Sequence, residues 1–196
     1  MTDQRSEHKP PPSPESLNSK PFSLGVTIKD LPYTFAGTIP QKPSDDFIWK
    51  IHVPSWKEIS PLVHPDFRRS SQFDQFETTG QIGALYVNGV KDILEPLYLS
   101  KLESNAELFP EDSPYHEARG IGGFLLNQLL ALADARGLSI EAYIQAEGRL
   151  SDQDMKRWFN NVGFSYNEHG GGDFIRKPAA PDFTQPIMSL LQAEAS

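Results

Sequence analysis

The stretch HEARGIGGFLLNQLLALADARG, residues 116–137, joins a glycine turn to an apolar helix pattern. The apolar residues recur one turn apart, which predicts an amphipathic helix that packs against a core. The residues of this face are Ile121, Leu125, Leu129 and Leu132. Gly137 follows Arg136 and is expected to end the helix in a left-handed conformation. Three glycines, Gly120, Gly122 and Gly123, stand where the helix begins.

Strands are predicted on both sides of this helix. The apolar or alternating runs are 22–28, 33–39, 47–53, 80–87 and 92–102 before it, and 138–146, 163–166 and 173–178 after it. Asn88 and Gly89 stand between two of these runs and predict a two-residue type I′ hairpin. A second helix is expected over 151–162, with Ser151 as its N-cap.

The order strand, helix, strand implies a parallel pair of strands inside a mixed sheet. We therefore expect an α/β fold with one domain over 22–178. Five prolines among polar residues predict a disordered tail at 1–21. A disordered, proline-rich C-terminal tail is also expected at 179–196, with a short helix near 186–194.

Composition excludes several classes of function. The chain has 196 residues and no cysteine, which excludes a disulfide framework, thiolate metal ligands and a cysteine nucleophile. The five histidines have no zinc-type spacing, so no metal site is expected. No apolar run is long enough to span a membrane, and the N-terminus lacks a signal-peptide core. We expect a cytoplasmic protein, with export by a specialised secretion system left open.

The net charge of −8 also bears on partners. A negative chain repels phosphate backbones, so no nucleic-acid partner is expected. The same field attracts cationic molecules such as polyamines, aminoglycosides and lysine-rich tails, although solubility alone also accounts for the charge.

Two familiar readings of the sequence GIGG do not fit. A dinucleotide-binding G-x-G-x-x-G would need a glycine where Leu125 stands, and a phosphate-binding P-loop would need Gly-Lys-Ser/Thr. Two readings remain. The glycines let the helix start pack tightly, or they form an anion cradle in which free backbone N–H groups and the helix dipole bind a phosphate, with Arg119 adding charge.

The stretch SPYHEARGIGGFLLNQLLALADARGL resembles motif A of the GCN5-related N-acetyltransferases, whose pattern runs V-x-P-x-x-Q/R-x-x-G-x-G/A into an apolar helix. Pro114, Gly120 and Gly122 have the matching spacing. Downstream, WFNNVGF resembles the end of the family's motif B at Gly163 and Phe164. The resemblance covers roughly residues 80–178, about half of the chain.

The resemblance implies a mixed sheet whose two central parallel strands splay apart, with acetyl-CoA in the splay. The pyrophosphate of the cofactor would lie on the N–H groups of Arg119, Gly120, Ile121, Gly122 and Gly123. The implied reaction is direct attack of a primary amine on the thioester, without a covalent enzyme intermediate. The amine would belong to a small molecule, a protein lysine or a protein N-terminus.

The catalytic residues are less well marked. Glu103 ends a predicted strand and is a candidate general base, although it also fits a solvated loop glutamate. The family's frequent general-acid tyrosine falls on Phe159, so Tyr143 and Tyr166 are considered as substitutes, each against an ordinary strand role. Glu117 occupies the Gln/Arg position of motif A.

These departures keep two alternatives open beside an N-acetyltransferase. One is a catalytically inert domain of the same fold that works as a binding module or a secreted effector. The other, weaker alternative is an acetyltransferase toxin that acts on charged tRNA, which a basic stripe on the folded surface would favour.

Overall fold

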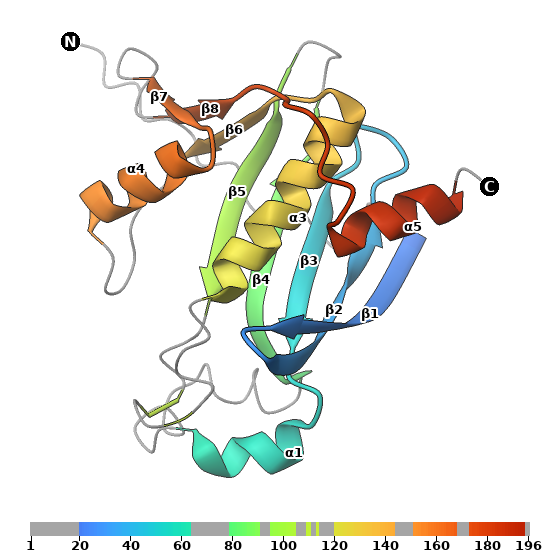
Figure 1. The fold of residues 1–196 in the computed structure, drawn as a ribbon, viewed down its shortest axis with the longest axis vertical. Coiled ribbons are helices and arrows are strands. Elements are labelled where there is room, and N and C mark those ends of the chain that lie inside the picture. Colours follow the sequence, from blue (N-terminus) through green and yellow to red (C-terminus); the bar gives the residue numbers. More distant parts are fainter. Residues whose placement is uncertain are drawn as a thin grey trace, which may run out of the picture.

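The computed structural model describes residues 20–63, 79–90, 95–104, 109–110, 113, 120–143, 151–167 and 173–194. These residues form an eight-stranded sheet with the strand order β1-β2-β3-β4-β5-β6-β8-β7 (Figure 1). The strands are β1 Lys20–Ile28, β2 Leu31–Ile39, β3 Phe47–His52, β4 Gln81–Asn88, β5 Leu97–Ser104, β6 Ile140–Tyr143, β7 Ser165–Asn167 and β8 Asp173–Arg176. The helices are α1 Trp56–Ile59, the short 3-10 helix η2 Ser60–Leu62, α3 Ile121–Arg136, α4 Asp152–Asn161 and α5 Pro186–Glu194.

The sheet is mixed, as predicted. Among the described pairings, β5 and β6 run parallel, whereas the other neighbours run antiparallel. Helix α3 connects these two parallel strands. The predicted α/β fold is therefore confirmed, together with the two central helices.

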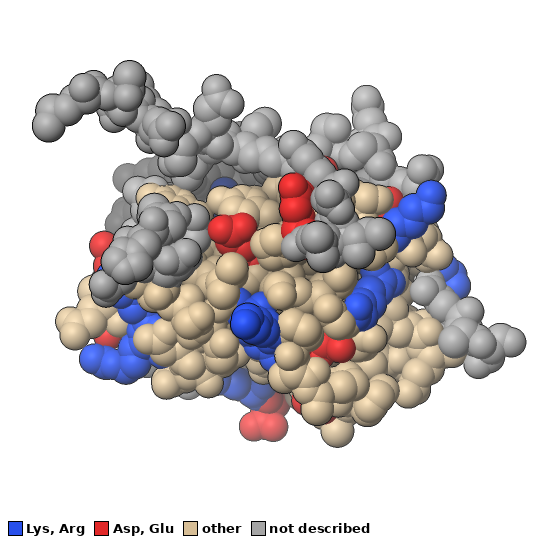
Figure 2. Space-filling model, turned by 90° about the horizontal axis from the view of Figure 1, so that it is seen from above, with Lys and Arg blue, Asp and Glu red and all other residues tan. Residues whose placement is uncertain are grey.

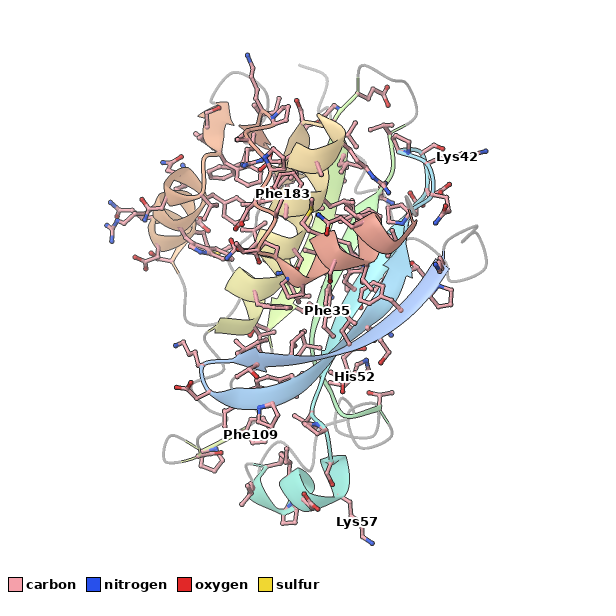
Figure 3. All side chains as sticks on the ribbon, turned by 45° about the vertical axis from the view of Figure 1, so that its right-hand side comes forward. Phe35, Lys42, His52, Lys57, Phe109 and Phe183 are labelled. Carbon is pink, nitrogen blue, oxygen red and sulfur yellow. The ribbon has the colours of Figure 1, made fainter. Side chains whose placement is uncertain are left out.

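The core lies between one face of the sheet and the helices α3, α4 and α5. Phe35 of β2 packs edge-on against Phe124 of α3, with 5.4 Å between the ring centroids, and against Trp49 of β3 at 5.6 Å. Figure 3 shows Phe35 near the middle of the molecule. Phe159 of α4 packs on the same face of the sheet against Phe174 of β8, at 5.4 Å. The predicted apolar face of α3 is fully buried: Ile121, Leu125, Leu129 and Leu132.

The C-terminal segment belongs to this core, so the expectation of a disordered C-terminal tail is wrong. Helix α5 forms near the predicted position, and its Ile187 and Met188 are 0% and 3% exposed. The buried side chain of Gln128 on α3 donates to the Gln185 side chain at 2.7 Å and accepts from the Ile187 N–H at 3.0 Å. Gln128 therefore holds the N-terminal end of α5 against α3.

The expected N-terminal boundary also needs correction. Strand β1 begins at Lys20, so the last two residues of the expected tail lie in the sheet. Lys20 pairs with Ile39, and the ladder hydrogen bonds to β2 order this segment. Residues 1–19 lie outside the described residues.

The predicted two-residue hairpin at Asn88 and Gly89 is wrong. Asn88 lies within β4 and pairs with Tyr98 of β5, so the connection runs from Gly89 to Pro96. The Gly89 N–H donates to the Asp46 carboxylate at 2.8 Å. A Cβ on Gly89 would collide with the backbone of Ser44. A glycine is therefore needed here because the loop before β3 approaches the backbone closely, and not because the chain makes a tight turn.

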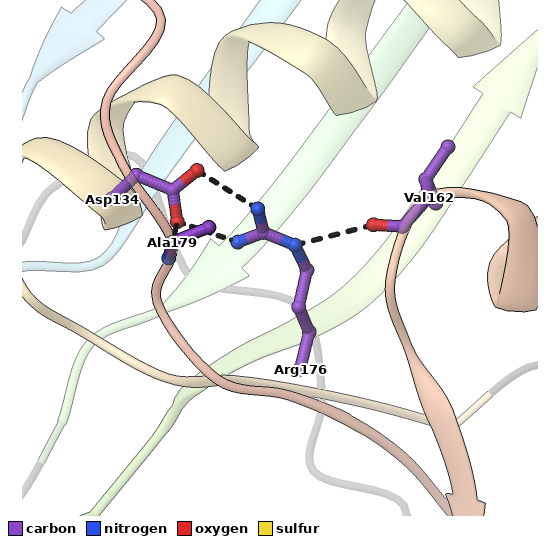
Figure 4. A network of polar contacts seen from close by, with 4 residues as sticks. All are labelled: Asp134, Val162, Arg176 and Ala179. Atoms are coloured by element: carbon purple, nitrogen blue, oxygen red, sulfur yellow. Dashed lines mark hydrogen bonds and ion pairs between the residues drawn. The ribbon is translucent and has the colours of Figure 1, made fainter.

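A buried ion pair ties the end of α3 to the C-terminal strands (Figure 4). The Arg176 guanidinium donates two hydrogen bonds, of 2.7 and 2.8 Å, to the Asp134 carboxylate, and their side chains are only 9% and 6% exposed. Arg176 Nε donates to the Val162 carbonyl, and the Ala179 N–H donates to Asp134. Burial alone raises the pKa of Asp134, but the hydrogen bonds from Arg176 and Ala179 and the guanidinium charge outweigh it and lower that pKa.

We expect Asp134→Asn to lower the free energy of unfolding by about 3–5 kcal/mol, because it leaves a buried guanidinium without its counter-charge. The lowered pKa of Asp134 contributes stability above the ordinary carboxyl pKa, and this contribution is lost as the pH falls through the folded-state value. The difference between wild type and variant should therefore shrink in acid. Urea titrations across this pH range measure it.

Asp30→Asn is the matched control, because Asp30 is exposed in a left-handed turn position that asparagine accepts. It should be nearly neutral. An Asp134→Asn protein as stable as wild type at neutral pH would contradict the structural role of the pair.

Candidate functional site

The N-terminus of α3 lies directly on β4, at the end of β5. Gly83 of β4 has no side chain, and the Ile121 side chain occupies the place that a Cβ would need. Gly83 pairs with Ser104, the last residue of β5. Figure 1 shows the arrowhead of β5 beside the beginning of α3. The glycine turn of the sequence is thereby brought to the carboxyl end of a central strand.

The three glycines at this turn differ in what surrounds them. A Cβ on Gly120 would lie 2.9 Å from Ile28 Cγ2 and 3.5 Å from Lys29 Cγ, so packing requires a glycine there. A Cβ on Gly122 would make only ordinary contacts, 3.8 Å from Trp158 and 4.0 Å from Ser104. A Cβ on Gly123 would have no described atom within 4 Å. Tight packing therefore explains Gly120 but leaves Gly122 and Gly123 unexplained.

Free backbone groups explain the other two glycines better. The first four N–H groups of a helix have no partner within the helix, and the helix dipole adds positive charge there. In α3 these groups belong to Gly120, Ile121, Gly122 and Gly123. Absent side chains at Gly122 and Gly123 leave room for an anion to approach them. We call these four residues the glycine cradle.

The parallel pairing of β5 and β6 stops before the cradle is reached. It covers three residue pairs, from Leu97 with Ile140 to Leu99 with Ala142. Strand β5 continues to Ser104 without a β6 partner, whereas β6 ends at Tyr143. A register shift against β4 makes Ser100 an extra, bulged residue where the parallel pairing ends. From Ser100 onward, no described residue of β6 pairs with β5.

A group of four polar residues surrounds Glu103 on the sheet face opposite to the helices. It consists of Gln81 and Tyr86 of β4 and Lys101 and Glu103 of β5, and we call it the Glu103 cluster. Lys101 forms an ion pair with Glu103, and its Nζ lies 6.0 Å from the centre of the Tyr86 ring. The Glu103 side chain is 28% exposed. Glu103 is therefore a partly buried strand residue rather than a solvated loop glutamate.

Tyr86 is hydrogen-bonded within this cluster. Burial raises the pKa of Tyr86, and the negative charge of Glu103 and a hydrogen bond to it raise that pKa further. Lys101 and a hydrogen bond from Gln81 act in the opposite direction but do not cancel the rise. At neutral pH the Tyr86 hydroxyl is thus protonated and donates to the Glu103 carboxylate.

The other predicted site residues have different positions. Arg119 and Glu117 lie outside the described residues. Tyr143 is 37% exposed at the end of β6; by strand alternation it shares the sheet face of Glu103 but is not part of the Glu103 cluster. Tyr166 lies on β7, where Lys156 packs over its ring at 4.1 Å. Phe159 is 1% exposed among Phe164 and Phe174, so it is a core residue.

Sequence reasoning missed Tyr86 and Lys101 as partners of Glu103. Both lie in predicted strands, but their meeting depends on the register in which Tyr86 pairs with Lys101 and Ala84 pairs with Glu103. The alternation Lys101, Leu102, Glu103 was the only available signal, since it puts both charged residues on one face. Trp158 was also missed, because its approach to Gly122 joins two separate helices.

The different surroundings of the glycines lead to opposite effects of alanine. Gly120→Ala should destabilise the fold, because its Cβ would press on Ile28. Gly123→Ala should stabilise the fold by about 0.5–1 kcal/mol, because its Cβ has room and alanine is the better helix former. Chemical denaturation of both variants beside wild type measures this. Equal destabilisation by the two substitutions would show that packing requires both glycines.

Comparison with known proteins adds no assignment: no protein-family model, no curated protein and no solved structure matches the chain. Within the described ranges, no helix is long and apolar enough to cross a membrane. No group of three or more histidine, cysteine or acidic side chains suited to a metal ion occurs in the part of the chain that the structure describes.

Proposed function

We propose that this chain is an acetyl-CoA-dependent N-acetyltransferase that acts on a primary amine. One observation carries the proposal: within the described residues, the parallel pairing of β5 and β6 covers only three residue pairs, and the glycine cradle stands at the far end of β5. The motif A resemblance of residues 113–138 implies this same combination of parted strands and phosphate-binding glycines.

The residues of the cradle fit a pyrophosphate. The N–H groups of Gly120, Ile121, Gly122 and Gly123 would bind its oxygens, and no described atom lies closer than 3.8 Å to a Cβ position at Gly122 or Gly123. The stem of Lys29 passes Gly120, where its Cε lies 3.6 Å from the position of a Cβ, and this brings a cation to the same end of the helix. Trp158 and Ser104 border the cradle beside Gly122.

The part of β5 beyond Leu99 fits the chain that links the phosphates to the thioester. In the part of the chain that the structure describes, no β6 residue pairs with the backbone of β5 beyond Leu99. Amide groups of a bound cofactor would pair with this backbone as a strand does, which satisfies groups that otherwise depend on water. When bound, acetyl-CoA supplies an acetyl group activated as a thioester.

The two faces of the sheet then have different roles. The cradle lies on the helix face, whereas Glu103 lies on the opposite face. In this proposal the reacting groups would meet beyond Leu99, where the described pairing of β5 and β6 ends. An amine that enters from the face opposite to the helices would meet Glu103 there.

In this proposal Glu103 acts as the general base. Its carboxylate takes one proton from the substrate ammonium, which leaves a neutral amine able to attack the thioester carbonyl. The new N–C bond forms, the C–S bond breaks, and the second amine proton leaves with the thiol as free CoA. Glu103 afterwards releases its proton to solvent. The net charge of −8 favours the approach of cationic amines.

The inert binding module is the competing function, and the burial of Phe159 in the core favours it. No hydroxyl stands at the position where the family often has its acid. The tRNA-directed alternative has less support. On the face seen in Figure 2, the described basic and acidic side chains are interspersed and form no basic stripe.

The substitution Gly122→Asp should disrupt phosphate binding by the cradle without unfolding the protein. An acidic residue in the first turn of a helix interacts favourably with its dipole, by about 0.3–1 kcal/mol, so the protein should stay folded. The same carboxylate would repel a phosphate. We expect acetyl-CoA to raise the melting temperature of wild type but not of the variant. Ligand-induced stabilisation of equal size in both proteins would exclude the cradle as the phosphate site.

Glu103→Gln tests the base. With a panel of spermidine, an aminoglycoside and a lysine-rich peptide, we expect kcat for any accepted amine to fall about 10²-fold or more, with acetyl-CoA affinity unchanged. Free CoA can be followed with a thiol reagent without background, because the protein has no cysteine. A variant with wild-type kcat would remove Glu103 from the mechanism.

A further inference from the structure

We infer that Tyr86 is a positioning residue, whose hydroxyl orients the Glu103 carboxylate toward the acceptor amine. This inference rests on the proposed function, and it assigns a role in that reaction to a residue outside motifs A and B.

The sheet register brings the two residues together. Ala84 pairs with Glu103, and Tyr86 pairs with Lys101, so Tyr86 and Glu103 are diagonal neighbours on the same face of adjacent antiparallel strands. Such diagonal neighbours are within reach of a long aromatic side chain. Neither side chain needs to leave its strand, so the geometry is fixed by the ladder rather than by a loop.

The hydrogen bonds of the Glu103 cluster form a chain in which each donor points toward Glu103. The Gln81 side chain donates to the Tyr86 oxygen, and the Tyr86 hydroxyl donates to Glu103. Gln81 is only 6% exposed, so it is fixed in place. Lys101 donates to the same carboxylate in an ion pair. The carboxylate is thus held by two donors, and its remaining lone pairs are available to a substrate ammonium.

Tyr98, Glu141 and Tyr143 share this face beyond the bulge at Ser100, and two further charged or titratable groups lie on β3. Lys50 of β3 pairs with Ala84, and therefore lies across that small residue from Glu103. His52 of β3 pairs with Gln81 and contacts the Thr79 carbonyl through Nδ1 at 2.8 Å. Among the described residues, Tyr86 and Lys101 are the groups with interactions to Glu103, so their removal should change its behaviour most.

The positions of the protons during the proposed reaction define the role of Tyr86. The ammonium proton moves to Glu103, which becomes neutral, while Tyr86 keeps its own proton throughout. Tyr86 stabilises the carboxylate before transfer and sets its orientation. Its loss would leave catalysis possible but poorly aligned, unlike the loss of Glu103.

The first test is Tyr86→Phe, measured by steady-state kinetics with acetyl-CoA and the amine that wild type accepts. We expect kcat to fall by up to about 10²-fold, the size expected for a misplaced catalytic group. KM for acetyl-CoA should not change, so the effect should appear in kcat alone. Tyr33→Phe is the matched control, since Tyr33 lies on β2 outside the Glu103 cluster, and it should match wild type.

The second test needs no turnover. The ultraviolet absorbance of tyrosinate, recorded for wild type minus Tyr86→Phe, isolates Tyr86 among the six tyrosines. Glu103→Gln should lower the pKa of Tyr86, because it removes the nearby negative charge. An unchanged titration would show that the two side chains do not interact and would overturn the inference.

The two proposals fail separately. If wild type acetylates an amine while Tyr86→Phe keeps its kcat, the positioning role is wrong and the proposed function stands. If wild type acetylates no amine of the panel and binds no acetyl-CoA, the proposed function fails, and the positioning role falls with it.

Discussion

The early end of the pairing between β5 and β6 is the constraint on which the rest of the site depends. Among the described residues, three residue pairs join these strands, and no described residue of β6 pairs with β5 beyond Leu99. A fully paired strand would have closed the sheet there and separated its two faces. The end of β5 that pairs with β6 is well fixed, because the Leu97 N–H also donates to the Ser139 carbonyl at 2.8 Å. The ion pair of Arg176 and Asp134 fastens β8 and α4 to the last turns of α3.

Fixing one end of α3 also fixes the other. Asp134 is held at its C-terminal end, Gln128 is held in the middle by α5, and Ile121 is seated on Gly83 at its N-terminal end. The helix therefore cannot slide along the sheet, and the free N–H groups of the cradle keep their position at the end of β5. In the proposed function, a cradle held in this way would bind an anion without the entropy cost of ordering a loop.

Local sequence signals predicted the parts of the fold that local interactions determine. Gly137 ends α3 with φ 66°, and Ser151 caps α4 with a 3.1 Å hydrogen bond from the Asp154 N–H. Asn88-Gly89 misled because its preference for a tight turn is weaker than the docking of Gly89 on Asp46, which is 43 residues away. The packing of helix α5 on α3 was not predicted for the same reason, because Gln128 of α3 and its hydrogen-bond partner Gln185 are 57 residues apart in the sequence.

The two parts of the candidate site also differ in how far the sequence could predict them. The glycine cradle is contiguous in sequence, so a pattern could predict it. The Glu103 cluster joins β4 and β5 through their register, including a bulge at Ser100, and no spacing in the sequence specifies that register. Only Glu103, as the last charged residue of a strand, was accessible to sequence reasoning.

The central claim is that the parted strands and the cradle hold a CoA thioester. Its most direct test is isothermal titration of the full chain with acetyl-CoA, with free CoA and NADH as comparison ligands. The account predicts saturable binding of acetyl-CoA and of free CoA, which share the pyrophosphate and the amide-bearing arm, and no binding of NADH, which has a pyrophosphate but lacks that arm. Absence of heat with acetyl-CoA at millimolar concentration would contradict it, and equal binding of NADH would show a site that recognises phosphates without regard to the thioester arm.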